Sequence, residues 1–255
     1  MAAFLMKFML VMIFSMALFL LFTQKYVNPY TLGIIFGKKG SGKSTILTKL
    51  GIKHLMKGWT VYSTEPIYGA YQIDPKDIGV VKLVDDNYVP FDPDDYKGFE
   101  RIFQIVKNFF FPRKPKILLL IDEVGLVWHC RDFKSFRVEV RKFFKLQRHY
   151  HVKCIMFSQC FDVDKTLRDL TDYMYLVKNV GRVFVYGKRI HKFFTIRTCN
   201  SDENEGNSTL VESFEFDKFI FPGARTLTFI PHWSKYFDSF VAEDNLPLHK
   251  CKLVR

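Results

Sequence analysis

Cysteine is scarce in this sequence, and the cysteines present are not paired in any recognisable motif. The five of them, at positions 130, 154, 160, 199 and 251, include no C-x-x-C pair. An odd, scattered set favours reduced thiols in a cytosolic domain and excludes both a disulfide framework and a zinc site. The seven histidines are scattered too, and the spacing of His149 and His151 is poor for one helical face, so they are interpreted as non-ligands.

Negative charge is also in short supply. The chain has 26 acidic residues against 38 basic ones, which gives a formal net charge of +12. Such an excess favours a polyanionic partner, either nucleic acid or an anionic lipid surface, although it also aids solubility. An apolar fraction of 48% excludes disorder, and 255 residues suffice for one large α/β domain with a small appendage. No internal repeat is detectable.

One long apolar run stands near the start of the chain. Residues 4–22 are apolar apart from Lys7 and Ser15, close to the roughly 20 residues that cross a bilayer as a helix. A signal peptide is the main alternative, but no small-x-small cleavage site follows; a buried helix is the other. We interpret residues 1–25 as a membrane anchor. Lys25, Lys38 and Lys39 outweigh Lys7, so the positive-inside rule predicts that the C-terminal side faces the cytoplasm.

The strongest motif is a phosphate-binding loop. Residues 37–44, GKKGSGKS, fit G-x-x-x-x-G-K-[ST] without a mismatch. An apolar run of strand length, 32–36, precedes them, and apolar residues at helical spacing follow from Ser44. Strand, glycine loop and helix is the order that a P-loop requires. A Gly/Lys-rich surface turn is the alternative.

The residue types of this loop suit ATP and Mg²⁺. Glycines allow successive N–H groups to converge on phosphate oxygens, and the helix N-terminus adds a favourable dipole. Lys43 can reach the β- and γ-phosphates, and the Ser44 hydroxyl can bind Mg²⁺. The predicted nucleotide-binding residues are Gly37, Lys38, Lys39, Gly40, Ser41, Gly42, Lys43, Ser44 and Thr45.

A second chemical signal lies about 80 residues further on. The run 116–123, KILLLIDE, is a buried strand pattern that ends in two carboxylates. Asp122 is placed to hold the Mg²⁺ water shell opposite Ser44, the Walker B role, and Glu123 to polarise an attacking water. A strand-end cap is the alternative. The DE pair favours nucleotide hydrolysis over small-molecule kinase chemistry.

The next apolar strand, 152–159, ends in Gln159. In ring-forming P-loop ATPases the strand beside Walker B often ends in a polar sensor of the γ-phosphate. Gln159 is therefore our candidate for that role, with an ordinary strand-end glutamine as the alternative. Strands and helices alternate up to residue 199, which predicts an α/β fold with a mainly parallel, doubly wound sheet flanked by helices. Within it, strands are expected at 59–63, 80–84, 173–180, 183–186 and 191–199.

A cationic stripe follows the Walker B strand. Residues 133–150 are expected to form a helix with basic residues at three- and four-residue steps on one face: Lys134, Arg137, Arg141, Lys145 and Arg148. Phosphate backbone would fit such a stripe, and a solvated helix face is an equally good interpretation. Arg148 or Arg168 could alternatively reach the nucleotide of a neighbouring subunit. The domain organisation we expect is an anchor at 1–25, an ATPase domain at 26–200 and an appendage of unclear role at 201–255.

These features together resemble the zonular occludens toxin (Zot)-like family, which includes the assembly ATPases of filamentous phages. The resemblance covers about residues 30–180 and rests on the order GKKGSGKST, LLLIDE, Trp128 with Arg131, Gln147-Arg148-His149, Ser158-Gln159 and 164–168. It implies an oligomeric ATPase in the host inner membrane, with its ATPase domain on the cytoplasmic side. Such a motor would move single-stranded DNA together with other phage assembly proteins. Zot-like proteins usually place their membrane helix after the ATPase domain, whereas here the apolar segment comes first, and no toxin activity is inferred.

Two further interpretations remain open. One is a viral DNA-packaging ATPase whose N-terminal helix contacts a viral membrane or capsid. The other is a nucleotide-dependent switch or scaffold without motor activity. A sugar or nucleoside kinase fits less well, because no acceptor pocket signature is present and the basic stripe would have no role.

Overall fold

The computed structural model describes residues 2–24, 28–128, 136–160, 163–199, 208–216, 224–233, 236 and 252–253. The chain divides into two compact units, one of residues 1–29 with 86–115 and one of residues 30–85 with 116–255. The domain boundaries expected from the sequence stay a prediction, and much of the appendage at 201–255 lies outside the described residues.

The larger unit is built around a single sheet. Its strands are β1 (Leu32–Phe36), β2 (Thr60–Ser63), β3 (Tyr71–Gln72), β4 (Ile117–Ile121), β5 (Val152–Ser158), β6 (Tyr173–Val180), β7 (Phe184–Cys199), β8 (Ser208–Phe216), β9 (Arg225–Phe229) and β10 (Lys252–Leu253). They follow the order β10-β3-β2-β4-β5-β1-β6-β7-β8, with β9 also paired to β7. All pairs from β10 to β6 are parallel, and the remaining pairs are antiparallel. The predicted α/β class and mainly parallel sheet are confirmed.

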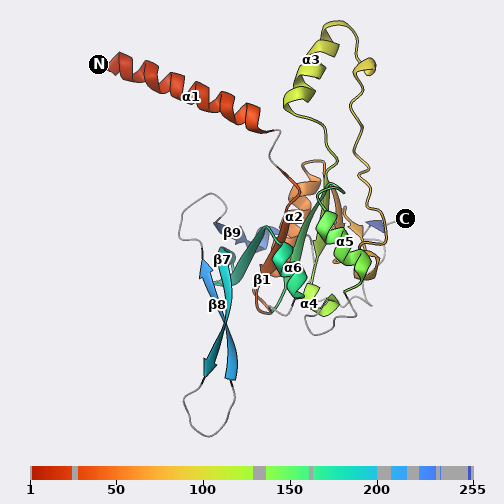
Figure 1. The fold of residues 1–255 in the computed structure, drawn as a ribbon, viewed down its shortest axis with the longest axis vertical. Coiled ribbons are helices and arrows are strands. Elements are labelled where there is room, and N and C mark those ends of the chain that lie inside the picture. Colours follow the sequence, from red (N-terminus) through yellow and green to blue (C-terminus); the bar gives the residue numbers. More distant parts are fainter. Residues whose placement is uncertain are drawn as a thin grey trace. The chain divides into compact units, whose positions relative to one another are not determined.

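The central strands are covered on both faces. Every residue of β1 and β4 is buried, as their continuous apolar sequences require. On one face the side chains of Leu32, Ile34 and Phe36 pack with residues of α4 (Val124–Val127), α5 (Val138–Leu146) and α6 (Lys165–Leu170). On the other face Ile35 packs with Ile46 and Leu47 of α2 (Lys43–Leu55). Helices on both faces make the doubly wound arrangement seen in Figure 1.

The last strands depart from the expected pattern. The two strands expected at 183–186 and 191–199 are one strand, β7, with an irregular register between Ile190 and Lys192. A bulge lets one strand bend while it continues, so a single element replaces the two that we predicted. β7 and β8 form the long antiparallel pair that is cyan and blue in Figure 1.

The predicted strand at 80–84 is wrong. This segment contains turn and irregular backbone, after a short 3-10 helix η1 (Pro75–Asp77). Its valines Val80, Val81 and Val84 are partly or largely exposed. The segment is held by single contacts instead of a ladder: the Tyr62 hydroxyl donates to the Val84 carbonyl oxygen at 2.8 Å. The valine content indicated a strand, but no described strand pairs with this segment.

Among its described residues, the smaller unit contains two helices and a short 3-10 turn. They are α1 (Ala2–Gln24), the 3-10 helix η2 (Pro93–Asp95), capped by the Asp92 side chain, and α3 (Gly98–Phe110). The Asp92 side chain accepts from the Asp94 N–H at 2.9 Å, which satisfies a backbone donor at the start of η2. The described side chains of 6–20 in α1 are exposed. Within the part of the chain that the structure describes, no helix meets both the length and the apolarity needed to cross a membrane.

Candidate nucleotide-binding site

The P-loop joins the end of β1 to the start of α2, as predicted. Two of its glycines have positive φ angles, +75° at Gly40 and +88° at Gly42, where an L-residue would be strained. The Gly37 N–H donates to the Ser158 carbonyl oxygen at 3.1 Å, which fixes the loop to the end of β5. An added Cβ at Gly40 would meet no atom within 4 Å, so the backbone there faces open space.

The loop's own side chains fit a phosphate group. Lys43 is buried (7% exposed), and its Nζ donates to the Gly37 carbonyl oxygen at 2.9 Å, so the amine curls back over the loop. The Ser41 hydroxyl is buried and has no hydrogen-bond partner among the described residues. A buried hydroxyl without a partner is costly unless a ligand satisfies it. Both features favour a phosphate at this loop.

The first carboxylate, Asp122, follows β4 directly. Its backbone N–H donates to the Thr64 hydroxyl at 2.8 Å, and its Oδ1 accepts from the Glu123 N–H at 3.0 Å. Burial raises the pKa of Asp122 to about 6, and the negative charge of Glu123 acts in the same direction. A buried carboxylate at this position gains most from a cation, which agrees with the metal-binding role predicted for it.

The second carboxylate lies against the P-loop lysine. Glu123 Oε1 is 3.8 Å from Lys43 Nζ and accepts a hydrogen bond from Gln159 Nε2 at 2.8 Å. Glu123 has φ +46°, an uncommon conformation for a non-glycine residue, and it is the residue before α4. The structure therefore brings together Lys43, Glu123 and Gln159, which we had placed in one site from three separate motifs.

The donor set suits Mg²⁺ better than a metal that needs a full protein cage. No group of three or more His, Cys, Asp or Glu side chains that could hold a metal occurs among the described residues. Mg²⁺ usually keeps several waters and binds through one or two protein oxygens plus phosphates. Ser44 at the start of α2 and Asp122 after β4 could supply those two oxygens.

Several contacts of the P-loop were missed by the sequence analysis. The β6–β7 hairpin lies beside the loop: a Cβ on Gly42 would come within 2.3 Å of Val185 Cγ2, and one on Gly37 within 2.7 Å of Val177 Cγ2. Asn179 Nδ2 donates to the Gly40 carbonyl oxygen at 3.4 Å. Thr64 was missed as well. Thr64 directly follows β2, and parallel strands end at one edge, so its position could have indicated a place in the site. No local sequence signal indicates Asn179.

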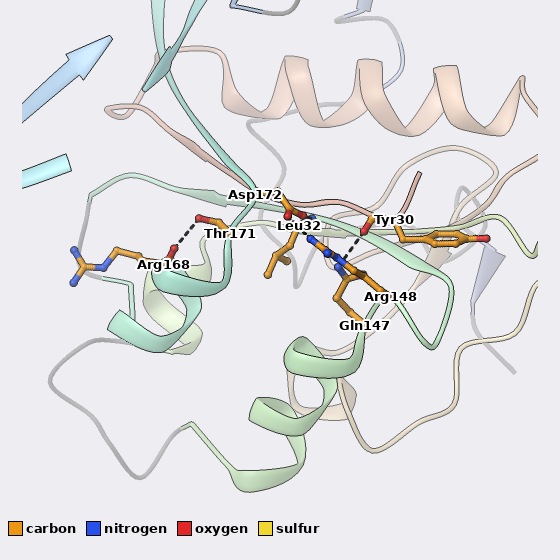
Figure 2. Close-up of polar contacts among 7 residues, drawn as sticks. All are labelled: Tyr30, Leu32, Gln147, Arg148, Arg168, Thr171 and Asp172. Carbon is orange, nitrogen blue, oxygen red and sulfur yellow. Dashed lines mark hydrogen bonds and ion pairs between the residues drawn. The ribbon is translucent and has the colours of Figure 1, made fainter. Parts of the chain in front are cut away.

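The two arginines considered as trans-acting groups have different surroundings (Figure 2). Arg148 forms an ion pair with Asp172, whose Oδ2 accepts from the Leu32 N–H at 2.8 Å. Leu32 is the first residue of β1, while the P-loop follows its last residue. The Arg168 side chain points away from this ion pair, from the end of α6. Arg148 therefore lies at the end of β1 opposite the P-loop, and a role for either arginine in a neighbouring subunit stays a prediction.

The cationic stripe is only partly formed as expected. Arg137, Arg141 and Lys145 are exposed, and the first of them is the cap residue before α5. Arg148 leaves the stripe for its ion pair with Asp172. Lys134, like Arg131 of the family resemblance, lies outside the described residues. The helix predicted at 133–150 is α5, Val138–Leu146, within the range that is described.

Comparison with known proteins gives structural likenesses alone. No family model and no curated protein matches this chain. Among solved structures, the N-terminal domain of zonular occludens toxin from Neisseria meningitidis is similar, with 18% identity, a TM-score of 0.41, and coverage of 74% of this chain and 95% of that one. The DNA-packaging ATPase B204 from Sulfolobus turreted icosahedral virus has 15% identity and a TM-score of 0.39, covering 64% and 94%.

The flagellar accessory protein FlaH from Methanocaldococcus jannaschii is similar as well, with 16% identity, a TM-score of 0.35, and coverage of 62% and 77%. The Zot domain is thus among the structures that this chain resembles, as the sequence motifs predicted. Identities and TM-scores this low assign no role to any residue here. The site is therefore described from its own geometry: a P-loop, two carboxylates and a polar strand end meet at the carboxyl edge of a parallel sheet.

Proposed function

We propose that this protein is a Mg²⁺-dependent ATPase. The observation that carries the proposal is the convergence of Lys43, Glu123 and Gln159 at the P-loop, where Glu123 Oε1 lies within 3.8 Å of a nitrogen of each of the other two. A turn that merely resembles a P-loop would not bring a buried lysine and a carboxylate from a different strand together.

Each residue has a chemical role in this proposal. The N–H groups of 40–45 and the Lys43 amine bind the phosphates of ATP. Ser44 and Asp122 hold Mg²⁺, which neutralises phosphate charge. Glu123 takes a proton from water as the water oxygen attacks the γ-phosphorus and the bond to the ADP oxygen breaks. Gln159 donates to Glu123 and orients it.

The test is ATP hydrolysis by the full chain in detergent, with one lysine variant in the P-loop and one outside it. Lys43→Ala should abolish hydrolysis, because the buried amine is removed. Lys57→Ala is the control: Lys57 is exposed just after α2 and outside the P-loop, so its variant should hydrolyse ATP at nearly the normal rate. Equal activity of the Lys43→Ala and wild-type proteins would refute the proposal.

We further propose that hydrolysis serves viral assembly or genome packaging by an oligomer that moves single-stranded DNA without sequence preference. The net charge of +12 and the exposed basic residues of α5 favour a polyanionic partner. Stimulation of hydrolysis by DNA separates this motor from the alternative, a nucleotide-dependent switch or scaffold, in which ATP binds with negligible turnover in both conditions.

Attachment to the host inner membrane, with the larger unit in the cytoplasm, completes the proposal. It is supported by the smaller unit, where two helices present apolar side chains to solvent. The exposed large side chains of α3 include Phe99, Ile102, Phe103, Val106 and Phe109. Exposed apolar surface on this scale is typical of membrane or protein contact. Other phage assembly proteins are the expected partners there.

A further inference from the structure

The strands β6, β7 and β9 form an antiparallel part of the sheet, and the two faces of this part differ. Cross-strand partners share a face, and alternate residues point to opposite faces. One face carries Val177, Asn179 and Val185, the residues beside the P-loop, and Thr228 of β9. Val177, Val185 and Thr228 are buried, and Lys49 of α2 donates to the Thr228 hydroxyl at 2.6 Å. This inner face is therefore packed on the P-loop and α2.

The opposite side, called here the outer β6–β7–β9 face, consists of three cross-strand rows. Its members are Leu176, Lys188 and Arg225; Lys178, Tyr186 and Leu227; and Val180, Phe184 and Phe229. Three of these nine residues are basic, three are aromatic, three are aliphatic and none is acidic. The composition differs from that of an ordinary solvated sheet face, where acidic and small polar residues would be mixed in.

Large apolar side chains of this face are open to solvent. The exposed fractions are 51% for Val180, 38% for Phe184, 62% for Leu227 and 46% for Phe229. The rings of Phe184 and Phe229 lie next to each other, with centroids 5.4 Å apart. Lys178 is exposed in the next cross-strand row and Arg225 in the row beyond it, and the Lys188 ammonium lies 4.5 Å from the centre of the Phe216 ring. The face thus carries a pair of neighbouring rings at one end and cations along its other rows.

All charged residues of β6, β7 and β9 are basic, whereas β8 beyond them carries two glutamates. Residues 173–199 contain six basic residues and no acidic one: Lys178, Arg182, Lys188, Arg189, Lys192 and Arg197. A second copy of this chain docked by the same face would bring like charges together, which opposes self-association through it. Single-stranded nucleic acid presents both phosphates and unstacked bases, so it uses cations and rings together.

We propose that the outer β6–β7–β9 face binds single-stranded nucleic acid, with bases stacked on Phe184 and Phe229 and phosphates bound by Lys178 and Arg225. This inference rests on the DNA-moving function proposed above and names the surface that performs it. The same strands contact the P-loop through Asn179 and α2 through Thr228. A change in the P-loop on nucleotide binding would therefore move strands whose opposite face binds the nucleic acid.

The test is binding of fluorescein-labelled single-stranded oligo(dT) to the full chain, measured by anisotropy over a range of salt concentrations. Lys178→Glu with Arg225→Glu should weaken binding at least tenfold and reduce the salt slope by about 0.7 for each phosphate that is no longer neutralised. Phe184→Leu with Phe229→Leu keeps apolar packing but removes the ring faces, and should weaken binding about tenfold with little change in slope.

Matched controls separate these effects from general changes in charge or aromatic content. Lys57→Glu changes one exposed lysine just after α2, and Tyr68→Leu removes one exposed ring. Both controls should bind oligo(dT) like the wild type. Crosslinking of bromodeoxyuridine-substituted oligonucleotide to the wild-type protein, mapped by mass spectrometry, gives a second measurement that needs no variant. Crosslinks are expected in β6, β7 or β9.

The outcomes are distinguishable from failure of the proposed function. Wild-type binding by both double variants, or crosslinks confined to other segments, would overturn the inference even if DNA stimulates hydrolysis. Double variants that bind DNA normally but no longer self-associate would also overturn the inference and assign the face to a second copy. Double variants that bind DNA normally but no longer bind vesicles would assign it to lipid. Conversely, oligo(dT) binding that both double variants weaken, in a protein that hydrolyses no ATP, would uphold this surface and refute the ATPase.

Discussion

At the scale of single residues, the two adjacent carboxylates have different surroundings and so different tasks. Asp122 is partly buried and accepts a hydrogen bond from the N–H of its neighbour Glu123, whereas the Glu123 side chain turns toward Lys43 and Gln159. The sequence order DE predicts a pair of carboxylates at a strand end, but only the left-handed backbone at Glu123 explains how the two side chains part.

Replacing Glu123 by Gln should separate binding from turnover. The amide keeps the shape of the carboxylate but cannot take a proton, so we expect hydrolysis to fall about 100-fold or more while ATP affinity stays nearly unchanged. Single-turnover hydrolysis and equilibrium binding of a fluorescent ATP analogue measure the two effects. Glu139→Gln, at an exposed position of α5, is the control and should hydrolyse ATP normally. Normal hydrolysis by Glu123→Gln would show that its assigned role is wrong.

Replacing Asp122 by Asn should stabilise the nucleotide-free protein at high pH. Burial raises the pKa of Asp122 from 3.8 to about 6 in the folded chain, so above pH 6 folding must keep a buried charge. That cost is absent below about pH 4 and complete above about pH 7, and the difference in pKa corresponds to about 3 kcal/mol at most.

Urea unfolding at pH 8 and at pH 4 measures this effect. The Asp122→Asn protein should be more stable than the wild type at pH 8, and the two should be equally stable at pH 4. Mg²⁺-dependent hydrolysis should nevertheless disappear, because the amide is a poor ligand for Mg²⁺. An Asn variant that is less stable than the wild type at pH 8 would contradict the burial argument.

At the scale of elements, the P-loop and the β6–β7 hairpin constrain each other. Gly42→Ala places a Cβ within 2.3 Å of Val185 Cγ2 and at φ +88°, whereas Gly40→Ala at φ +75° meets no atom within 4 Å. Left-handed backbone alone costs an L-residue about 1–2 kcal/mol. Gly40→Ala should therefore lose about that much stability, and Gly42→Ala clearly more.

The double variant Gly42→Ala with Val185→Ala tests the steric part of this cost. In urea unfolding, Gly42→Ala should lower the free energy of unfolding less in the Val185→Ala background than in the wild type, because the clash with Val185 Cγ2 is gone. If Gly42→Ala and Gly40→Ala were equally stable, the hairpin would not press on the loop in the way that the structure shows.

A second element-scale prediction concerns the start of β1. Asp172 accepts from the Leu32 N–H and pairs with Arg148, which is exposed (Figure 2). Asp172→Ala leaves a partly buried N–H without its acceptor and should cost about 1–3 kcal/mol. Arg148→Ala removes only an exposed ion pair and should cost less than about 1 kcal/mol. Equal destabilisation in urea unfolding would mean that the arginine, not the N–H, depends on Asp172.

How far the sequence predicted these elements depends on the range of the contacts involved. The P-loop, β4 and the strand ends at Gln159 and Asp122 follow from local patterns, because parallel strands end at a common edge. The position of Asn179 beside Gly40, 139 residues away, depends on β6 pairing with β1, which no local pattern fixes. The strand expected at 80–84 is wrong because valine content is a local signal, whereas a strand also needs a neighbouring strand edge to pair with, and the local sequence does not show whether one is present.

At the scale of the whole molecule, the chain combines one unit that contains the P-loop with another that exposes apolar helices. The smaller unit is assembled from two separate segments, 1–29 and 86–115. Within it, the rings of Phe22 after the exposed run of α1 and Phe110 at the end of α3 lie in edge-to-face contact, with centroids 5.4 Å apart. An attachment that uses both helices would explain why α3, inserted between β3 and β4, is amphipathic.

We predict that the full chain floats with phospholipid vesicles in a density gradient and that both helices contribute. Phe103→Ser with Phe109→Ser removes two exposed rings from α3 and should weaken flotation, while Leu10→Arg with Phe14→Arg in α1 should abolish it. Met56→Ser, which changes an exposed apolar residue of the larger unit, is the control and should float normally. ATP hydrolysis in detergent should be unchanged in all three, because the P-loop unit is intact. If the α1 variant still floated while the Met56 variant did not, membrane attachment would belong to the larger unit, and the role proposed for α1 would be wrong.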